Sequence, residues 1–177
     1  MKTKTEIILL ILKYLALFAA IGFSIECGSQ LFYFVASLIN PDWAKNGYEI
    51  ERNWFRIHEY STWYYICVMS LTISISGSKA LIWYLIFGLL LKLQLKSPFS
   101  MVVTKKLTTI SYLLLGVWIL MAFIGKTYGH YLTEATGIEL PAKYTGDEYF
   151  FIAGIVYIIS QIFKRGIEMQ EENSLTV

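Results

Sequence analysis

The sequence is poor in charge, cysteine and histidine, and each shortage excludes a class of protein. Only 16% of the 177 residues are charged, whereas a soluble domain usually carries about 25%, so the shortage of charge indicates a membrane protein rather than an ordinary soluble domain. The net charge of +2 is too small to favour nucleic-acid binding by bulk electrostatics. Two cysteines and two histidines leave no room for a cysteine-rich zinc site.

Catalytic and metal-binding motifs are also lacking. The sequence has no HExxH, no CxxC and no paired carboxylate motif. His58 and His130 fall in different predicted outer loops, where Glu59 and Glu134 could complete a metal or proton-sensing site. Nothing in their spacing fixes such a site, so exposed loop histidines are the favoured interpretation. We therefore expect no cofactor, and we expect that the protein is not an enzyme.

Long apolar segments are what the sequence has instead. Hydrophobic residues make up 56% of the chain, and a spanning helix needs about 20 consecutive, mostly apolar residues. Four segments meet or approach this requirement: residues 7–27, 76–95, 107–124 and 148–164. The sequence therefore predicts an all-α polytopic membrane protein with a single four-helix transmembrane domain, followed by a cytoplasmic tail over residues 165–177.

Basic residues gather on one side of the predicted membrane. That side comprises the N-terminus, the link between the second and third spans and the C-terminal tail. Its basic residues are Lys2, Lys4, Lys92, Lys96, Lys105, Lys106, Lys164 and Arg165. The two opposite loops hold fewer basic residues and many acidic ones. Cytoplasmic loops are enriched in lysine and arginine, so we expect both termini to lie in the cytoplasm.

Two further apolar segments, residues 31–39 and 64–75, lie beyond the first and second spans. They could lengthen these helices into an outer hairpin with residues 40–61 at its tip, or they could lie in the membrane interface. An interfacial aromatic belt would use Trp43, Trp54, Tyr60, Trp63, Tyr64 and Tyr65. The apolar–polar alternation over residues 71–76 also fits a short strand. The sequence leaves these alternatives open, and with them the start of the second span.

The third span has clear start and end signals. Ser97 is suited to cap its first turn, and Pro98 fits the first helical position because its missing N–H would have no partner there. Gly125 and Gly129 mark the expected outer end.

Glu26 and Lys79 are the candidate intramembrane charges. Glu26 lies about 29 Å along the helix from Ile7, and Lys79 lies about 20 Å above Lys92. Adjacent antiparallel helices could bring them together as an ion pair, or each could extend separately to the interface. Such a pair is the one candidate path for an ion or proton.

Cys27 and Cys67 both fall on or near the outer side. A disulfide requires Cα atoms within about 7 Å, whereas the two cysteines are expected at different heights. Buried, unpaired thiols are therefore the favoured interpretation.

The cytoplasmic side carries the candidate residues for docking a partner. In the link they are Lys96, Pro98 and Phe99, and in the tail they are Arg165, Glu168, Glu171, Glu172 and Leu175. Basic residues mark the membrane exit and acidic residues follow. A short helical docking segment and a frayed tail both fit this pattern.

Residues 162–177, with the sequence IFKRGIEMQEENSLTV, the turn KSPFS at residues 96–100 and Lys79-Ala80 carry a family resemblance. From about Lys79 to its end, the chain resembles a bacterial membrane-protein family catalogued as domain of unknown function 2975. The resemblance implies a four-helix protein of the bacterial cytoplasmic (inner) membrane and supplies no reaction. Members are often encoded beside a small helix-turn-helix regulator, which implies a membrane partner for a transcription factor.

Two functions follow as hypotheses. The first is an uncharacterised regulatory or sensory protein in the lipid bilayer that binds a cytoplasmic helix-turn-helix regulator. The second is a small transporter or channel subunit, built as a homo-oligomer.

Overall fold

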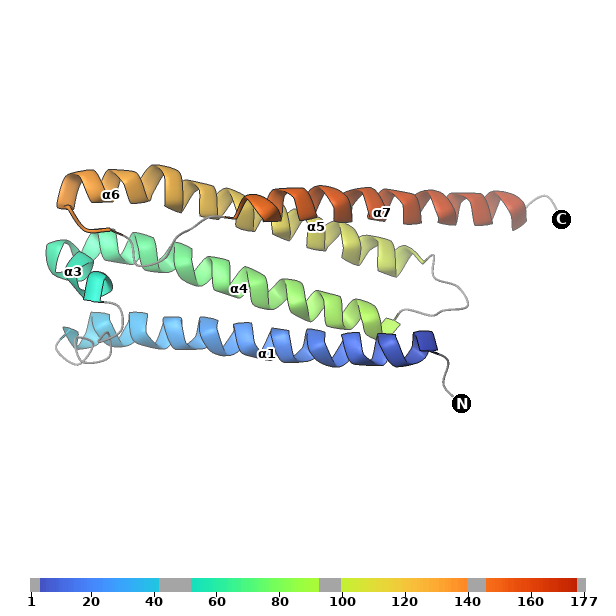
Figure 1. Cartoon of the computed structure of the whole chain (residues 1–177), viewed down its shortest axis with the longest axis horizontal. Helices are drawn as coiled ribbons and strands as arrows, with labels where there is room; N and C mark the ends of the chain where they lie inside the picture. Colours follow the sequence, from blue (N-terminus) through green and yellow to red (C-terminus); the bar gives the residue numbers. More distant parts are fainter. Residues whose placement is uncertain (1–3, 42–51, 93–99, 140–145, 175–177) are drawn as a thin grey trace.

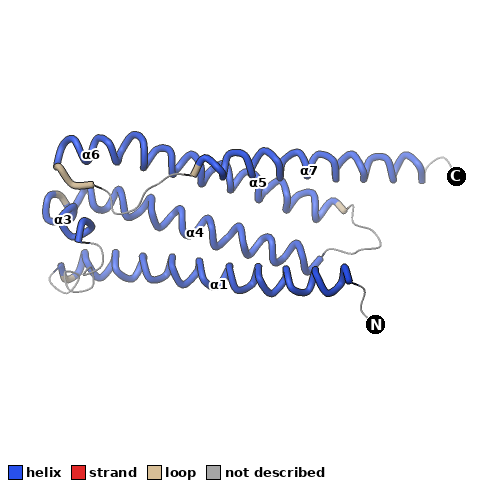
Figure 2. The backbone as a smooth tube through the Cα atoms, in the orientation of Figure 1, coloured by secondary structure: helices blue, strands red, loops and turns tan. Residues whose placement is uncertain are grey.

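The fold consists of helices joined by short non-helical segments in the part of the chain that the computed structural model describes, residues 4–41, 52–92, 100–139 and 146–174. No strand occurs within these ranges (Figure 2). The elements are α1 (Lys4–Ile39), α3 (Arg52–Tyr60), α4 (Thr62–Lys92), α5 (Met101–Ala122), the π-helix η1 (Phe123–Tyr128), α6 (Gly129–Thr136) and α7 (Asp147–Ser174). The predicted all-α class is confirmed.

Four of these helices, α1, α4, α5 and α7, are long and apolar enough to cross a membrane. They correspond to the four predicted spans. The main contacts run in a row, because α4 packs between α1 and α5, and α7 packs against α5. The row has an even number of crossings, so α1 begins and α7 ends at the same end of the molecule (Figure 1).

The first two spanning helices are longer than the membrane requires. α1 has 36 residues and α4 has 31, which correspond to about 54 and 46 Å, whereas the hydrocarbon core is about 30 Å thick. Residues 31–39 belong to α1, and residues 64–75 belong to α4. The extended hairpin is therefore the correct alternative, and the strand over residues 71–76 is wrong, because helix hydrogen bonds and side-chain packing override a six-residue alternation.

The third spanning helix differs from its prediction at both ends. Its N-cap is Ser100, whose hydroxyl accepts a hydrogen bond from the Val103 N–H at 3.3 Å. The predicted cap Ser97 and the adjacent Pro98 lie outside the described residues.

The outer end of that helix was predicted too early. The chain stays helical through η1 and α6, and Gly129 has helical dihedrals of φ −63° and ψ −43°. Ile124 and Leu132 are fully buried on either side of this glycine, so tertiary packing stabilises the helix where local propensity is weak. It ends instead at Gly137, whose φ of 68° suits glycine.

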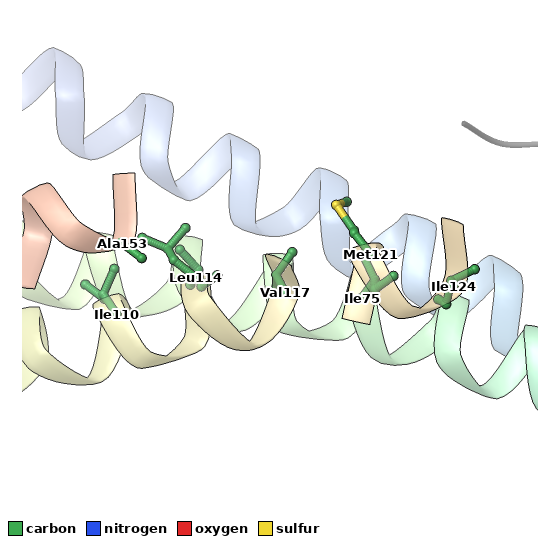
Figure 3. Packing of buried hydrophobic residues seen from close by; sticks show 8 residues of the cluster. Ile75, Ile110, Leu114, Val117, Met121, Ile124 and Ala153 are labelled. Atoms are coloured by element: carbon green, nitrogen blue, oxygen red, sulfur yellow. The ribbon is translucent and has the colours of Figure 1, made fainter. Parts of the chain in front are cut away.

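The described residues form two separate apolar cores. The first, called the membrane core, joins α4, α5 and α7 through residues that include Ile75, Leu114, Val117 and Ala153 (Figure 3). The second, called the outer core, joins α3, α4, α6 and Ile138, which follows α6 in the chain. Its buried members are Trp54, Ile57, Tyr65, Val68, Met69, Leu132 and Ile138. The α1 residue Phe34 packs against it. At the end of the molecule away from the two termini, the helices thus form a packed head of their own, here called the outer head.

The last helix runs well past the predicted span. α7 continues from Asp147 to Ser174, so residues 165–174 of the predicted tail are helical rather than frayed. Asp147 and Glu148 occupy its first turn, where negative charge is favourable near the positive end of the helix dipole.

Candidate functional site

A polar cluster lies between α1 and α4, in the half of these helices nearer the outer head. Ser76 donates a hydrogen bond to Glu26 Oε1 at 3.4 Å, and Gln30 donates to the same oxygen at 3.3 Å. Gln30 Oε1 is buried and has no hydrogen-bond partner among the residues that the structure describes. Such an atom is costly in an apolar setting, so this cluster combines a charge with an unsatisfied acceptor.

Lys79 lies one turn below Ser76 on α4. Its ammonium group is 5.9 Å from the ring centroid of Phe23 on α1 and 5.9 Å from that of Tyr149 on α7. Both distances are within the range of a cation–π interaction. Lys79 therefore joins the outer end of α7 to the hairpin formed by α1 and α4.

The two candidate intramembrane charges are neighbours without direct contact. Among the described residues, no ion pair within 4.0 Å joins Glu26 and Lys79. Each has other partners, which are a hydroxyl and an amide for Glu26 and two aromatic rings for Lys79. The ion pair stays a prediction.

The two cysteines are unpaired. Cys27 Sγ lies 3.8 Å from the Ile73 carbonyl oxygen, whereas Cys67 precedes Ile73 by six residues, which is about 9 Å of helix. The difference in height that argued against a disulfide is therefore present. A Cβ on Gly77 would lie 3.5 Å from the same sulfur, so the small residue at this position lets α1 and α4 approach closely.

The outer head contains a second set of polar contacts. Tyr65 is fully buried, and its hydroxyl lies 2.8 Å from Ser37 Oγ on α1. Tyr128 donates to the Tyr64 carbonyl at 3.4 Å, and the hydroxyls of Tyr64 and Tyr131 are also 3.4 Å apart. Burial, together with the nearby Cys67, Tyr64 and Tyr131, raises the pKa of Tyr128 to about 12.

Both histidines lie in helices rather than in the predicted loops. His58 belongs to α3 and makes an edge contact with Tyr65, with ring centroids 4.8 Å apart. His130 belongs to α6 and lies 3.2 Å from Glu134, both side chains being exposed. No group of three metal-ligating side chains occurs among the residues that the structure describes.

The predicted docking residues fall into two groups. On α7, Arg165 donates to Glu168 at 2.9 Å and lies 3.9 Å from Glu172, so the basic exit residue and two of the acids form one network on the helix. Glu171 lies on the same helix and is exposed. The remaining candidates are outside the described residues: Lys96, Pro98, Phe99 and Leu175.

Sequence reasoning missed a polar groove between α5 and α7. It has a volume of about 530 Å³, and its lining includes Thr104, Thr108, Tyr112, Tyr157 and Gln161. A signal for it is present in the sequence, because positions 104, 108 and 112 recur every four residues and therefore share one helix face. Polar residues recurring on one face of an otherwise apolar helix indicate a polar contact or a wet surface.

Comparison with known proteins gives one match. A family model described as "Protein of unknown function (DUF2975)" matches residues 18–177. No curated protein and no solved structure matches the chain.

Proposed function

Since the chain belongs to the family described as Protein of unknown function (DUF2975), we propose that it is a regulatory or sensory protein of the bacterial cytoplasmic membrane. Its cytoplasmic partner is a small helix-turn-helix regulator, and its two termini lie in the cytoplasm. The basic residues of the termini and of the link support this orientation through the positive-inside rule.

The observation that carries the proposal is the continuity of α7. One helix of 28 residues runs for about 42 Å, from the layer of Lys79 to an end beyond the span. Its first residue accepts a hydrogen bond from Trp118 Nε1 at 3.4 Å through Asp147 Oδ1. Tyr149 contacts Lys79 in the same layer. Because α7 is one continuous helix, a displacement of its outer end can move its inner end as well.

The contacts of α7 leave it room to move. Its extensive packing is with α5 alone, and most of its apolar residues face outward toward lipid, including Phe151, Ile155 and Ile158. Lipid-facing surfaces slide more readily than interlocked cores, because no packed neighbour has to rearrange. The outer head, with its own core, is the part suited to receive a signal.

The docking surface is the exposed, charged end of α7. Glu168 and Glu172 share Arg165, which leaves carboxylate oxygens at the surface for a basic partner. A regulator that binds DNA carries a basic face, so an acidic helix would compete with DNA for that face.

The test is co-purification of the full chain with the helix-turn-helix protein encoded beside it. We expect capture by the intact chain and loss of capture when Gly166–Val177 is deleted. The double variant E168Q/E172Q should weaken capture at low salt, and its difference from the parent chain should shrink at high salt because salt screens the exposed charges. The matched control is Glu134→Gln, which removes an exposed acid from the outer head.

Capture that survives the deletion would contradict the docking role. The stability of each variant in detergent is measured alongside, because a loss of capture is informative only if the variant elutes and unfolds like the parent chain.

A further inference from the structure

The groove between α5 and α7 lies at the cytoplasmic end of the spans. Lys105 is in the first turns of α5, and Lys164 follows Asp147 by 17 residues, or about 26 Å of helix. That distance is close to the hydrocarbon thickness of about 30 Å. Both lysines line the groove and therefore stand at the level of the lipid headgroups.

The two lysines have no acidic partner in the part of the chain that the structure describes. No carboxylate lies within 4.0 Å of either ammonium group. The neighbouring Arg165 differs, because its charge is satisfied by Glu168 and Glu172. Two uncompensated positive charges on facing helices repel each other unless an anion lies between them.

A further hydrogen-bond donor, Gln161, lies about one turn inward from Lys164. The hydroxyl of Thr104 already donates to the Ser100 carbonyl, so the donors open to an anion are the two ammonium groups and the Gln161 amide. Gln161 donates to Ser160 at 3.4 Å and retains further donor capacity. This end of the groove suits an anion with several oxygens, and a phosphate group has that chemistry.

The deeper end of the groove is aromatic. Tyr112 and Tyr157 face each other with ring centroids 6.2 Å apart, and Tyr112 lies seven residues beyond Lys105, or about 10 Å farther into the membrane. A free phosphate ion would use only the basic end. An anionic phospholipid would use the whole groove, with its phosphate at the lysines and its upper acyl chain against the tyrosines.

We propose that the groove between α5 and α7 binds an anionic phospholipid, with the headgroup phosphate held between Lys105 and Lys164. The proposal is independent of the cytoplasmic regulator, since it concerns lipid on the side of the helices rather than protein at the end of α7. A bound lipid would also link the end of α7 to α5, because its phosphate bridges the two helices.

The test is a lipid titration of the purified full chain in detergent, followed by native mass spectrometry. The ligands are phosphatidylglycerol and phosphatidylcholine, which share acyl chains and differ in net charge. We expect tighter binding of phosphatidylglycerol, and about 30-fold weaker binding of that lipid to K105Q/K164Q, or about 5-fold for each lysine. K105R/K164R keeps both charges and should bind like the parent chain.

The matched control is K13Q/K92Q. It removes the same charge from α1 and α4, and neither residue lines the groove. Its phosphatidylglycerol affinity should stay within about 3-fold of the parent value, because the loss of general surface charge is a weaker effect than the loss of a contact.

Equal binding of the two lipids, or an equal loss in the control and groove variants, would overturn the proposal. Inorganic phosphate distinguishes the two sources of phosphate. If it displaces phosphatidylglycerol with an affinity as high as that of the lipid, the site is one for a free anion. Circular dichroism verifies that every variant remains helical, and K105R/K164R tests the site independently of any folding defect in the glutamine variants.

Discussion

Tyr65 is the largest fully buried side chain of the outer head. Its hydroxyl lies 2.8 Å from Ser37 Oγ. Ser37 donates its own hydrogen to the Phe34 carbonyl at 2.7 Å, so Tyr65 is the donor to Ser37. This chain of hydrogen bonds joins α4 to α1 outside the membrane.

We expect Tyr65→Phe to lower the free energy of unfolding by about 1 kcal/mol, the usual net value of one such hydrogen bond. Ser37 keeps its bond to Phe34, so no group is left wholly unsatisfied. Denaturation of the purified protein in mixed micelles measures the change. Tyr60→Phe is the control because Tyr60 is 54% exposed; an equal loss there would contradict the assignment.

Tyr128 makes the stability of the outer head fall at alkaline pH. Burial raises its pKa from the ordinary value of 10.0 to about 12. The unfolded chain thus ionises Tyr128 first, so its contribution to stability is complete below pH 10 and is lost as the pH rises through about 12. We expect the melting temperature to fall over this range, and to fall less in Tyr128→Phe.

The control for that pH dependence is Tyr14→Phe, on an exposed part of α1. It should leave the alkaline transition as in the parent chain. A transition of equal size in the parent chain and in Tyr128→Phe would show that another group is responsible.

Among the elements, α6 has the most clearly defined end. Gly137 is the one residue with a positive φ, 68°, in the described part of the chain, and its N–H donates to the Thr133 carbonyl at 2.8 Å. The conformation closes the helix and directs Ile138 into the outer core, where it is 5% exposed.

We expect Gly137→Ala to destabilise the protein by about 1 kcal/mol, because the Cβ of an L-residue strains the left-handed conformation. Gly137→Asn should cost less, since asparagine tolerates this region. The control Gly116→Ala alters a glycine with open space around its Cβ position. Thermal unfolding compares the three variants, and an equal effect at both positions would argue against a backbone cause.

The arrangement of the whole molecule predicts that both termini lie on the same side of the membrane. Its four spanning helices put the start of α1 and the end of α7 at one end, and basic residues favour the cytoplasm for that end. Epitope tags on the two termini should therefore be digested together by protease in inside-out vesicles and protected together in right-side-out vesicles. Opposite accessibility of the two tags would contradict an even number of crossings.

The row arrangement of α1, α4, α5 and α7 also determines where binding surfaces lie. Helices in a row keep more lateral surface than helices in a closed bundle, and α1 and α7 stand at its edges. Their exposed apolar side chains, including Phe18, Ile25, Phe151 and Ile158, suit lipid contact. Hence the groove beside α7 is open to the bilayer, which is the condition for a lipid to enter it.

The sequence by itself determined the four spans, the all-α class and the side on which basic residues collect. These properties follow from the free energy of transferring apolar and charged groups between water and lipid. That free energy depends on the composition of each helix and not on its neighbours. For the same reason, the sequence correctly anticipated that Cys27 and Cys67 differ in height along the helices.

Only the tertiary structure decided how far the helices extend and which side chains meet. The passage of the third helix through Gly125 and Gly129 depends on burial of Ile124 and Leu132 against other helices, an energy that no local pattern contains. The contacts of Lys79 could not be predicted from local sequence either, because its partners lie 56 residues before it and 70 residues after it. Rotation and height of packed helices fix such contacts.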